Sequence, residues 1–328
     1  MRGQGASVPD EVIFQRQFQE LCRNIDDFIR GKPRVVHLAV VCLLARGHLL
    51  IEDVPGVAKT SLAKVIAQSI AGATVKRIQF TPDLLPSDVT GVQIYDQTRG
   101  VFEFRQGPVF ANILLGDEIN RASPKTQSAL LEVMAERQVT VDGVPRGVPD
   151  PFLCVATQNP VEHQGTFTLP EAQLDRFLMR ITVGYPDTLE DEAVIIADGI
   201  ARRRPEESAS VMELDDLRLM IKAAQELHVS EELRRYVGTI TRATRNHQDV
   251  RLGVSPRGSI ALAVASQAYA ISMGRSFVTS DDVKAVAVPV LGHRILLTPE
   301  AKVQKQTTEA LVEDILASAP VPRSRGRG

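Results

Sequence analysis

The chain has 328 residues, 44% of them hydrophobic, which is enough for one large core or two smaller ones. The 38 basic and 40 acidic side chains nearly cancel, which argues against nucleic acid or an anionic membrane as a charge-driven partner. Cys22, Cys42 and Cys154 form no C-x-x-C pair, so we expect no disulfide framework or zinc site and predict a reducing cytoplasm. Residues 1–10 lack the apolar segment of a secretory signal, and the apolar run 35–45 is too short to cross a bilayer.

The first predicted elements are two helices and a strand. Hydrophobic residues recur at helical spacing from Phe14 to Phe28, and a second helix is predicted over residues 33–45. The apolar run 48–52 ends at a Pro-Gly pair, which predicts a buried strand that enters a tight turn. A helical pattern resumes over residues 61–71.

Strand and helix then alternate along the chain. Two more apolar strands are predicted over residues 113–115 and 152–156, with a helix over 124–137 between them. This alternation predicts an α/β fold with a mostly parallel sheet covered by helices. After Pro186 only helical patterns follow. These predicted helices span residues 189–203, 214–227, 231–246, 256–273 and 280–288.

These patterns also divide the chain into domains. Thr279, followed three residues later by Asp282, fits a capping box at the start of the last predicted helix. The C-terminal residues are rich in proline, glycine and arginine, which is typical of a flexible tail. We predict an N-terminal helical segment over 1–32, an α/β core over 33–186, a connecting helix and linker over 187–208, a helical domain over 209–318 and a tail over 319–328.

Residues 53–60 have the spacing of a phosphate-binding loop, G-x-x-x-x-G-K-[ST]. In such a loop, backbone N–H groups and the N-terminus of the next helix surround the phosphates. We predict that Lys59 reaches the β- and γ-phosphates of a nucleotide and that Thr60 holds magnesium. The predicted nucleotide-binding residues here are Val54, Pro55, Gly56, Val57, Ala58, Lys59, Thr60 and Ser61.

Two residues of this loop depart from the pattern. Asp53 and Ala58 stand where the pattern has glycine. Ala58 costs nothing if its φ is negative, but its methyl group can crowd the nucleotide. Taken alone, the segment fits an ordinary strand, turn and helix equally well.

The strand that begins at residue 113 leads into two adjacent acids, Asp117 and Glu118. Strand alternation points the two carboxylates to different places at the carboxyl edge of the sheet, where ligands bind in open α/β folds. Asp117 can then bind the nucleotide's magnesium ion, and Glu118 can orient and polarise the attacking water. An acidic pair that opens an ordinary loop is the alternative, and the phosphate-loop spacing upstream weighs against it.

Five segments together resemble the MoxR family of AAA+ ATPases, and they keep that family's order. The resemblance runs from about residue 33 to residue 301. It implies an AAA+ P-loop domain with a five-stranded parallel sheet and a small all-α lid, with ATP as substrate and Mg²⁺ as cofactor. In this family an alanine before the phosphate-loop lysine is familiar. The segments are residues 48–60, 116–122, 156–160, 169–178 and 254–257.

The resemblance implies roles for three further residues. Asn159 is similar to the sensor 1 residue, whose amide contacts the γ-phosphate or the attacking water, although a loop asparagine is the alternative. Arg176 resembles the arginine finger, which is presented to the nucleotide of a neighbouring subunit; a surface ion pair is the alternative. Arg257 resembles sensor 2, which couples the lid to the γ-phosphate. Whether Arg257 serves its own subunit or a neighbour stays open, because this family carries a helix 2 insertion that can reposition the lid.

That insertion is predicted over residues 82–108. Hydrophobic residues flank the turn-like segment 96–100, which predicts a β-hairpin. In related ATPases such excursions face the ring pore or a client, so Phe102 and Phe104 are contact candidates. A hairpin packed on its own domain is an equal alternative.

Three functions are compatible with these motifs. The resemblance implies an ATP-driven chaperone that acts as a ring, expected to be a hexamer, on client proteins, with separate von Willebrand factor A-domain partners. A nucleic-acid motor of the related helicase type is the alternative, but outside the tail arginines 323, 325 and 327 the sequence shows no added basic segment. A scaffold without turnover rests only on Asp53 and Ala58. Neither an H-E-x-x-H nor a G-x-S-x-G motif is present.

Overall fold

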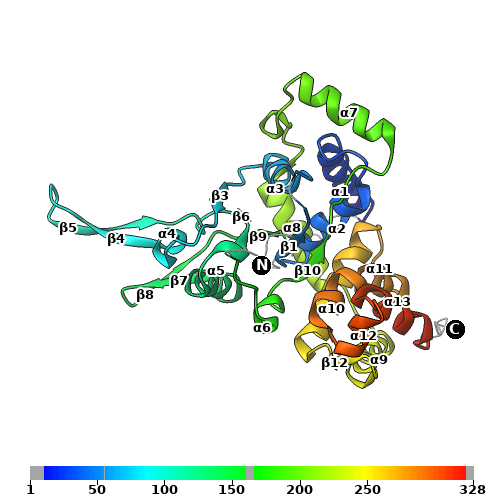
Figure 1. Ribbon diagram of the computed structural model, residues 1–328. Coiled ribbons are helices and arrows are strands. Elements are labelled where there is room, and N and C mark those ends of the chain that lie inside the picture. The colour runs from blue at the N-terminus through cyan, green and yellow to red at the C-terminus, as the bar shows by residue number, and fades with distance from the viewer. Residues whose placement is uncertain (1–10, 55, 160–165, 323–328) are drawn as a thin grey trace, which may run out of the picture. The chain divides into compact units, whose positions relative to one another are not determined.

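The computed structural model describes residues 11–54, 56–159 and 166–322, which pack as two compact units (Figure 1). The first unit contains residues 21–40 and 46–214, and the second contains residues 11–20, 41–45 and the chain from 215 onward. Among the described residues, no helix combines the length and apolar character that a membrane span needs. Of the predicted site residues, Pro55 lies outside the described residues.

A five-stranded sheet forms the centre of the first unit, with the strand order β10-β1-β9-β6-β3. All four neighbouring pairs are parallel, so the predicted α/β fold with a five-stranded parallel sheet is confirmed. Leu49 of β1 pairs with Met179 of β10 and with Val155 of β9. The strands are β1 (Leu49–Glu52), β3 (Val75–Gln79), β6 (Ile113–Asp117), β9 (Leu153–Gln158) and β10 (Met179–Ile181).

Helices α3 (Lys59–Gln68) and α5 (Pro124–Glu136) contribute buried side chains beside this sheet. A hydrophobic cluster joins Leu130 and Met134 of α5 to alternate strand residues such as Leu114. Alternate strand residues share one face of a sheet, which is why a single helix can cover them. Ser123 caps α5 by accepting a hydrogen bond from the Thr126 N–H.

Further elements belong wholly or partly to the first unit. Helices α1 (Glu11–Asp26) and α2 (Pro33–Leu44) are each divided between the two units, and α7 (Leu189–Ile200) follows β10 in the first unit. All three were predicted, although α7 ends three residues earlier than expected. The remaining elements here are β2 (Ile70–Ala71), α4 (Pro86–Thr90), the 3-10 helices η1 (Ile119–Arg121) and η2 (Pro205–Glu207), α6 (Glu171–Leu174) and β11 (Met212–Glu213), which pairs with β2.

The predicted insertion forms a hairpin of β4 (Gly91–Asp96) and β5 (Val101–Gln106), which projects from the sheet as an arm (Figure 1). Asp96 closes the turn by accepting hydrogen bonds from two backbone N–H groups. A second hairpin, β7 (Gln138–Val141) with β8 (Val144–Gly147), was not predicted. Its Arg146 guanidinium lies 4.2 Å from the centre of the Phe104 ring. Phe104 is therefore packed within its own unit, whereas Phe102 is 69% exposed.

The second unit is built mainly from helices, as predicted. Its longest are α9 (Glu231–Asn246) and α10 (Pro256–Ser272). The capping box is present, because Thr279 and Asp282 exchange side-chain and backbone hydrogen bonds at the start of α11. Only helices were predicted here, yet two short strands pair as well. The other elements are α8 (Leu214–Glu226), β12 (Val250–Leu252), α11 (Ser280–Leu291), η3 (Gly292–Arg294), β13 (Leu296–Leu297), α12 (Pro299–Val303) and α13 (Thr308–Ser318).

Candidate active site

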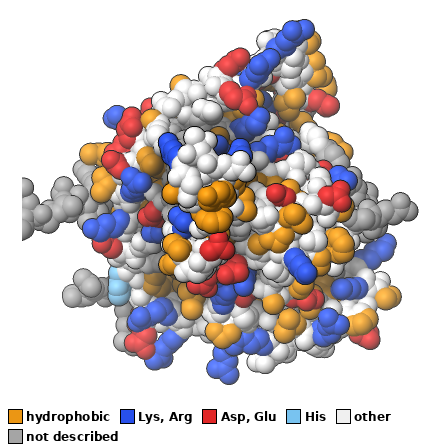
Figure 2. Space-filling view, turned by 90° about the vertical axis from the view of Figure 1, so that its left-hand side faces the viewer, with side chains coloured by type: hydrophobic (Ala, Val, Ile, Leu, Met, Phe, Trp, Pro, Cys, Tyr) orange, Lys and Arg blue, Asp and Glu red, His pale blue; other side chains and the backbone are white. Residues whose placement is uncertain are grey.

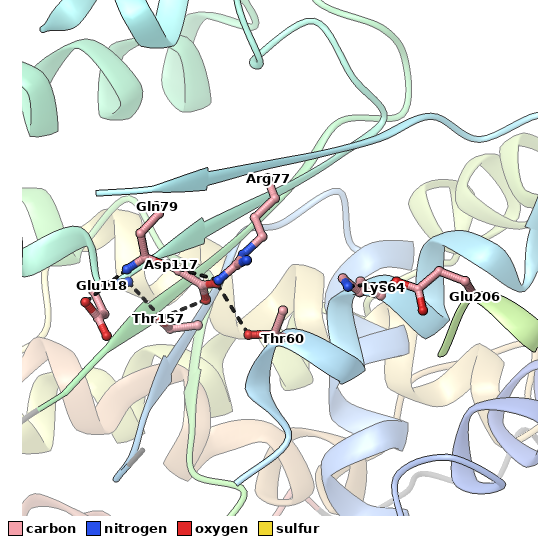
Figure 3. A network of polar contacts seen from close by, with 8 residues as sticks. All are labelled: Thr60, Lys64, Arg77, Gln79, Asp117, Glu118, Thr157 and Glu206. Carbon is pink, nitrogen blue, oxygen red and sulfur yellow. Dashed lines mark hydrogen bonds and ion pairs between the residues drawn. The ribbon is translucent and has the colours of Figure 1, made fainter. Parts of the chain in front are cut away.

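Three neighbouring strands deliver five predicted site residues to one edge of the sheet. Lys59 and Thr60 follow β1, Asn159 follows β9, and Asp117 and Glu118 stand at the end of β6. Because β1, β9 and β6 are adjacent and parallel, their carboxyl ends lie side by side. The structure therefore brings the phosphate loop and the acidic pair together, as Figure 3 shows for Thr60 and the two acids.

The phosphate loop turns through two residues with positive φ. Gly56 has φ 87°, and Ala58, which precedes α3, has φ 57° and ψ 18°. The condition under which Ala58 would cost nothing is thus not met, because an L-residue in the left-handed region costs about 1–2 kcal/mol. With this backbone conformation, Ala58 is the N-cap of α3, and the helix begins at Lys59. The first N–H groups of an α-helix have no carbonyl partner within it, which suits this end to phosphate.

Asp53 anchors the start of the loop. The residue is 7% exposed, and its carboxylate accepts three backbone hydrogen bonds. Oδ1 accepts from the Val54 N–H at 2.7 Å, and Oδ2 accepts from the Val183 N–H at 2.8 Å and the Gly184 N–H at 2.6 Å. Asp53 therefore ties the phosphate loop to the chain that leaves β10. The sequence motif carries no signal for this contact, because two of the three partners are backbone groups 130 and 131 residues away.

Lys59 lies over the same loop. Its ammonium group donates to the Asp53 carbonyl at 2.6 Å and to the Gln158 carbonyl at 3.4 Å. Asp53 directly follows β1 and Gln158 ends β9, so the ammonium group lies at the carboxyl edge of the sheet. An ammonium group at this place is suited to contact phosphate oxygens.

Asp117 is the centre of the acidic cluster. Its side chain is 8% exposed, and the Thr60 hydroxyl lies 3.4 Å from Oδ2. The Thr157 hydroxyl lies 3.3 Å from Oδ1. Carboxylate and hydroxyl oxygens that converge in this way are ligands of the kind that Mg²⁺ prefers. The residues present therefore fit a magnesium ion between Thr60 and Asp117.

Glu118 points elsewhere than Asp117, as predicted, but strand alternation is not the reason, because Glu118 follows the end of β6. Its backbone is left-handed, with φ 57° and ψ 51°, and its N–H donates to the Thr157 hydroxyl at 2.9 Å. The carboxylate is half-buried and accepts hydrogen bonds from Gln79 at 3.0 Å and from Arg121 at 3.1 Å. Two donors thus hold this carboxylate in place, where it can accept a proton from water.

The edge strand β3 supplies two site residues that were not predicted, Arg77 and Gln79. Arg77 Nε lies 2.7 Å from Asp117 Oδ2, and its Nη2 donates to the Gln79 side chain at 3.1 Å (Figure 3). They are two positions apart, so they lie on one face of the strand. No sequence signal marked them, because Val-Lys-Arg-Ile-Gln lacks the continuous apolar run of a buried strand.

Asn159 and Arg176 differ in their relation to this edge. Asn159 is 4% exposed, and its carbonyl accepts a hydrogen bond from the Asn120 side chain at 3.4 Å. Arg176 precedes β10, whose first residue pairs with the first residue of β1. It therefore lies at the amino edge of the sheet, where its guanidinium donates to the Leu131 carbonyl.

Arg257 belongs to the second unit. It is exposed in the first turn of α10, where Ser255 caps the helix by accepting a hydrogen bond from the Gly258 N–H at 3.3 Å. An arginine at a helix N-terminus is disfavoured by the helix dipole, so the local structure gives little reason for it.

The linker contacts the helix that follows the phosphate loop. Glu206 of η2 accepts a hydrogen bond from Lys64 of α3 at 2.7 Å (Figure 3). This bond lowers the pKa of Glu206. The predicted linker therefore contacts α3 within the first unit.

Comparisons with known proteins match both parts of the chain. A model of the ATPase family associated with various cellular activities (AAA) matches residues 48–179, and a model of the AAA lid domain matches residues 242–315. YeaC of Bacillus subtilis is 48% identical over 92% of this chain and 94% of that protein. Chaperone MoxR1 of Mycobacterium tuberculosis is 41% identical over 92% of this chain and 81% of that protein. A crystal structure from Cytophaga hutchinsonii, of a protein assigned as an ATPase, is 34% identical with a TM-score of 0.88, and the match covers 96% of this chain and 97% of that chain.

Proposed function

This chain belongs to the MoxR family of AAA+ ATPases, and we propose that it hydrolyses ATP to remodel or mature client proteins. The observation that carries the proposal is the meeting of the phosphate loop and the acidic pair at one edge of the sheet. The Thr60 hydroxyl and Asp117 carboxylate are 3.4 Å apart although 57 residues separate them in sequence.

Each group at this edge has a task in the proposed reaction. Lys59 and the N-terminus of α3 bind the phosphates and compensate their charge. Glu118 orients the attacking water and accepts its proton, held by Gln79 and Arg121. Asn159 supplies an amide for the γ-phosphate or the water.

Thr60 and Asp117 would hold magnesium. When bound, this ion would neutralise charge on the phosphate oxygens of ATP. The support is the pair of oxygen ligands that converge beside the phosphate loop.

A ring is the proposed working state, with a hexamer as the expected form. Arg176 lies at the amino edge of the sheet, opposite its own phosphate loop, so the nucleotide it serves is that of a neighbouring subunit.

An exposed apolar stripe on α7 also supports assembly into a ring. Leu189, Ile196 and Ile200 form one stripe on this helix and are 77%, 57% and 79% exposed. Asp198, on the opposite side, pairs with Arg30 at 3.5 Å, which holds the stripe outward.

The β4–β5 arm is the proposed contact for a client. Tyr95 and Phe102 are 51% and 69% exposed, and their ring centres lie 5.1 Å apart. Figure 2 views the molecule from the side on which the arm projects, and hydrophobic side chains lie there among charged ones. Exposed apolar side chains of this kind are suited to bind an extended or partly unfolded chain.

We further propose that the protein acts with separate von Willebrand factor A-domain partners in the cytoplasm, and that its domains have the limits predicted from the sequence. A nucleic-acid motor is not favoured, because the relatives named above include a chaperone and the net charge is −2.

The proposal is tested with Glu118→Gln. This variant removes the proton acceptor but keeps the shape of the side chain. We expect ATP turnover, measured by phosphate release, to fall by about 100-fold or more, with ATP affinity changed less than about threefold. Light scattering of the Glu118→Gln protein in ATP then gives the mass of the assembled ring. Affinity capture with the same variant in ATP identifies the client that it retains.

The matched control is Glu132→Gln, an exposed glutamate on α5. It should retain wild-type turnover. Unchanged hydrolysis in Glu118→Gln would remove the assigned role. Loss of nucleotide binding together with hydrolysis would show instead that Glu118 holds the loop rather than the water.

A further inference from the structure

A guanidinium group contacts the Asp117 carboxylate beside the Thr60 hydroxyl. Arg77 Nε lies 2.7 Å from Asp117 Oδ2, the same oxygen that lies 3.4 Å from the Thr60 hydroxyl. Figure 3 shows Arg77 reaching from β3 toward this pair. We propose that Arg77 and Mg²⁺ compete for the Asp117 carboxylate, so that Arg77 sets the magnesium concentration at which the site accepts its nucleotide. This inference rests on the proposed function, because it takes Thr60 and Asp117 as the magnesium ligands.

Burial explains why the contact forms. The Asp117 side chain is 8% exposed, whereas that of Arg77 is 51% exposed. A buried carboxylate is costly unless an opposite charge compensates it, and a guanidinium with a charge-assisted hydrogen bond supplies that charge. A divalent cation satisfies the same requirement with two charges. One carboxylate oxygen therefore has two candidate cations.

The exposed half of Arg77 allows the exchange. A long side chain that is half in solvent can leave Asp117 by rotamer changes alone, without moving β3. A second contact holds it, because Arg77 Nη2 donates to the Gln79 side chain at 3.1 Å. Departure of Arg77 thus costs two hydrogen bonds, and that cost raises the concentration of Mg²⁺ needed.

If Arg77 competes with Mg²⁺, its removal changes the magnesium midpoint of nucleotide binding in the opposite direction from the change expected if Arg77 helps to bind the nucleotide. If Arg77 helped to bind the negatively charged nucleotide, its removal would weaken binding with and without Mg²⁺. If it competes with the metal, its removal makes Mg²⁺ more effective. The two roles therefore differ in the sign of the change in magnesium midpoint.

The test compares Arg77→Gln with the wild-type protein. Binding of a fluorescent, non-hydrolysable ATP analogue is measured in EDTA and then at rising Mg²⁺, which gives the magnesium midpoint without any turnover. We expect the midpoint of Arg77→Gln to fall by about threefold to tenfold. Arg77→Lys keeps the charge but loses the planar fork, so its midpoint should fall between the two.

Lys76→Gln is the matched control, because Lys76 is an exposed cation on the same strand whose side chain points to the other face. Its midpoint should equal that of the wild type. An unchanged or higher midpoint in Arg77→Gln would overturn the inference, as would an equal fall in Lys76→Gln. If the wild-type protein bound no nucleotide at any Mg²⁺ concentration, the proposed function itself would fail, and the inference with it.

Discussion

The two ends of the candidate site are held by different kinds of partner. After β1, the Asp53 carboxylate and the Lys59 ammonium group bond mainly to backbone N–H and carbonyl groups. After β6, Asp117 and Glu118 bond mainly to side chains. Backbone partners move only when the chain moves, whereas side-chain partners can exchange by rotation. The phosphate loop is thus the fixed half of the site, and the acidic pair is the half that can change partners.

The phosphate loop and the acidic pair each contain a residue whose backbone lies in the left-handed region. Ala58 precedes α3, and Glu118 precedes η1, with φ 57° at each. Such residues persist where surrounding contacts over-determine them, and they cluster at functional sites. At Glu118 a side chain, Thr157, satisfies the backbone N–H. At Ala58 the neighbouring loop is fixed through Asp53.

The largest expected effect on stability tests the fixed half. Asp53→Asn keeps the shape of the side chain but turns one acceptor into a donor and removes the charge. At least one of the three backbone N–H groups, of which that of Val183 is buried, then loses its acceptor, so we expect the free energy of unfolding to fall by about 2–4 kcal/mol. Urea denaturation measures this change.

Glu52→Gln is the control for Asp53→Asn. Glu52 is the preceding residue, and its half-exposed carboxylate pairs with Arg180 at 2.9 Å. An ion pair of this exposure contributes at most about 1 kcal/mol. If Asp53→Asn lost no more stability than Glu52→Gln, the backbone contacts of Asp53 would not fix the loop, and the comparison of the two halves would break down.

A smaller change tests the adjustable half. Thr157→Val removes the hydroxyl that accepts from the Glu118 N–H and lies 3.3 Å from Asp117. We expect a loss of about 1–2 kcal/mol in unfolding free energy, because the part-buried Glu118 N–H loses its partner. Turnover should fall by about tenfold while nucleotide affinity stays within about threefold, since the acids are misplaced and the loop is not.

Thr140→Val provides the reference for this prediction, because Thr140 is an exposed strand residue in the same unit. It should change stability by less than about 0.5 kcal/mol. Loss of nucleotide affinity in Thr157→Val as large as its loss of turnover would show that the two halves of the site are not separable.

The sequence predicted the fold where its pattern was strongly periodic or apolar. The buried strands β1, β6 and β9 were found because they are continuous apolar runs, and α5 and α9 because their periodicity is long. The edge strand β3 was missed, since Val-Lys-Arg-Ile-Gln has one buried residue in five. The short strands of the second unit were missed because two or three residues carry no period.

The site was predictable as far as motifs reach. Lys59, Thr60, Asp117 and Glu118 follow from spacing, because phosphate and magnesium demand those groups at the ends of strands. Arg77 and Gln79 do not follow, since their contact with the acids depends on a strand order that one sequence does not give. The role of Asp53 was equally hidden, because its partners are backbone groups that any residues would supply.

The smallest expected effect concerns Ala58, the left-handed residue of the fixed half. Ala58→Gly removes a left-handed cost of about 1–2 kcal/mol but adds backbone freedom to the unfolded chain, so we expect a net gain of about 0.5 kcal/mol in thermal or urea unfolding. Ala197→Gly, at an exposed position inside α7, should instead lose about 1 kcal/mol. The same substitution, alanine to glycine, should therefore raise the free energy of unfolding at Ala58 and lower it at Ala197. This difference distinguishes backbone strain at Ala58 from helix propensity at Ala197. If both variants lost stability, the loop would hold Ala58 without strain, and its rigidity would rest on Asp53 alone.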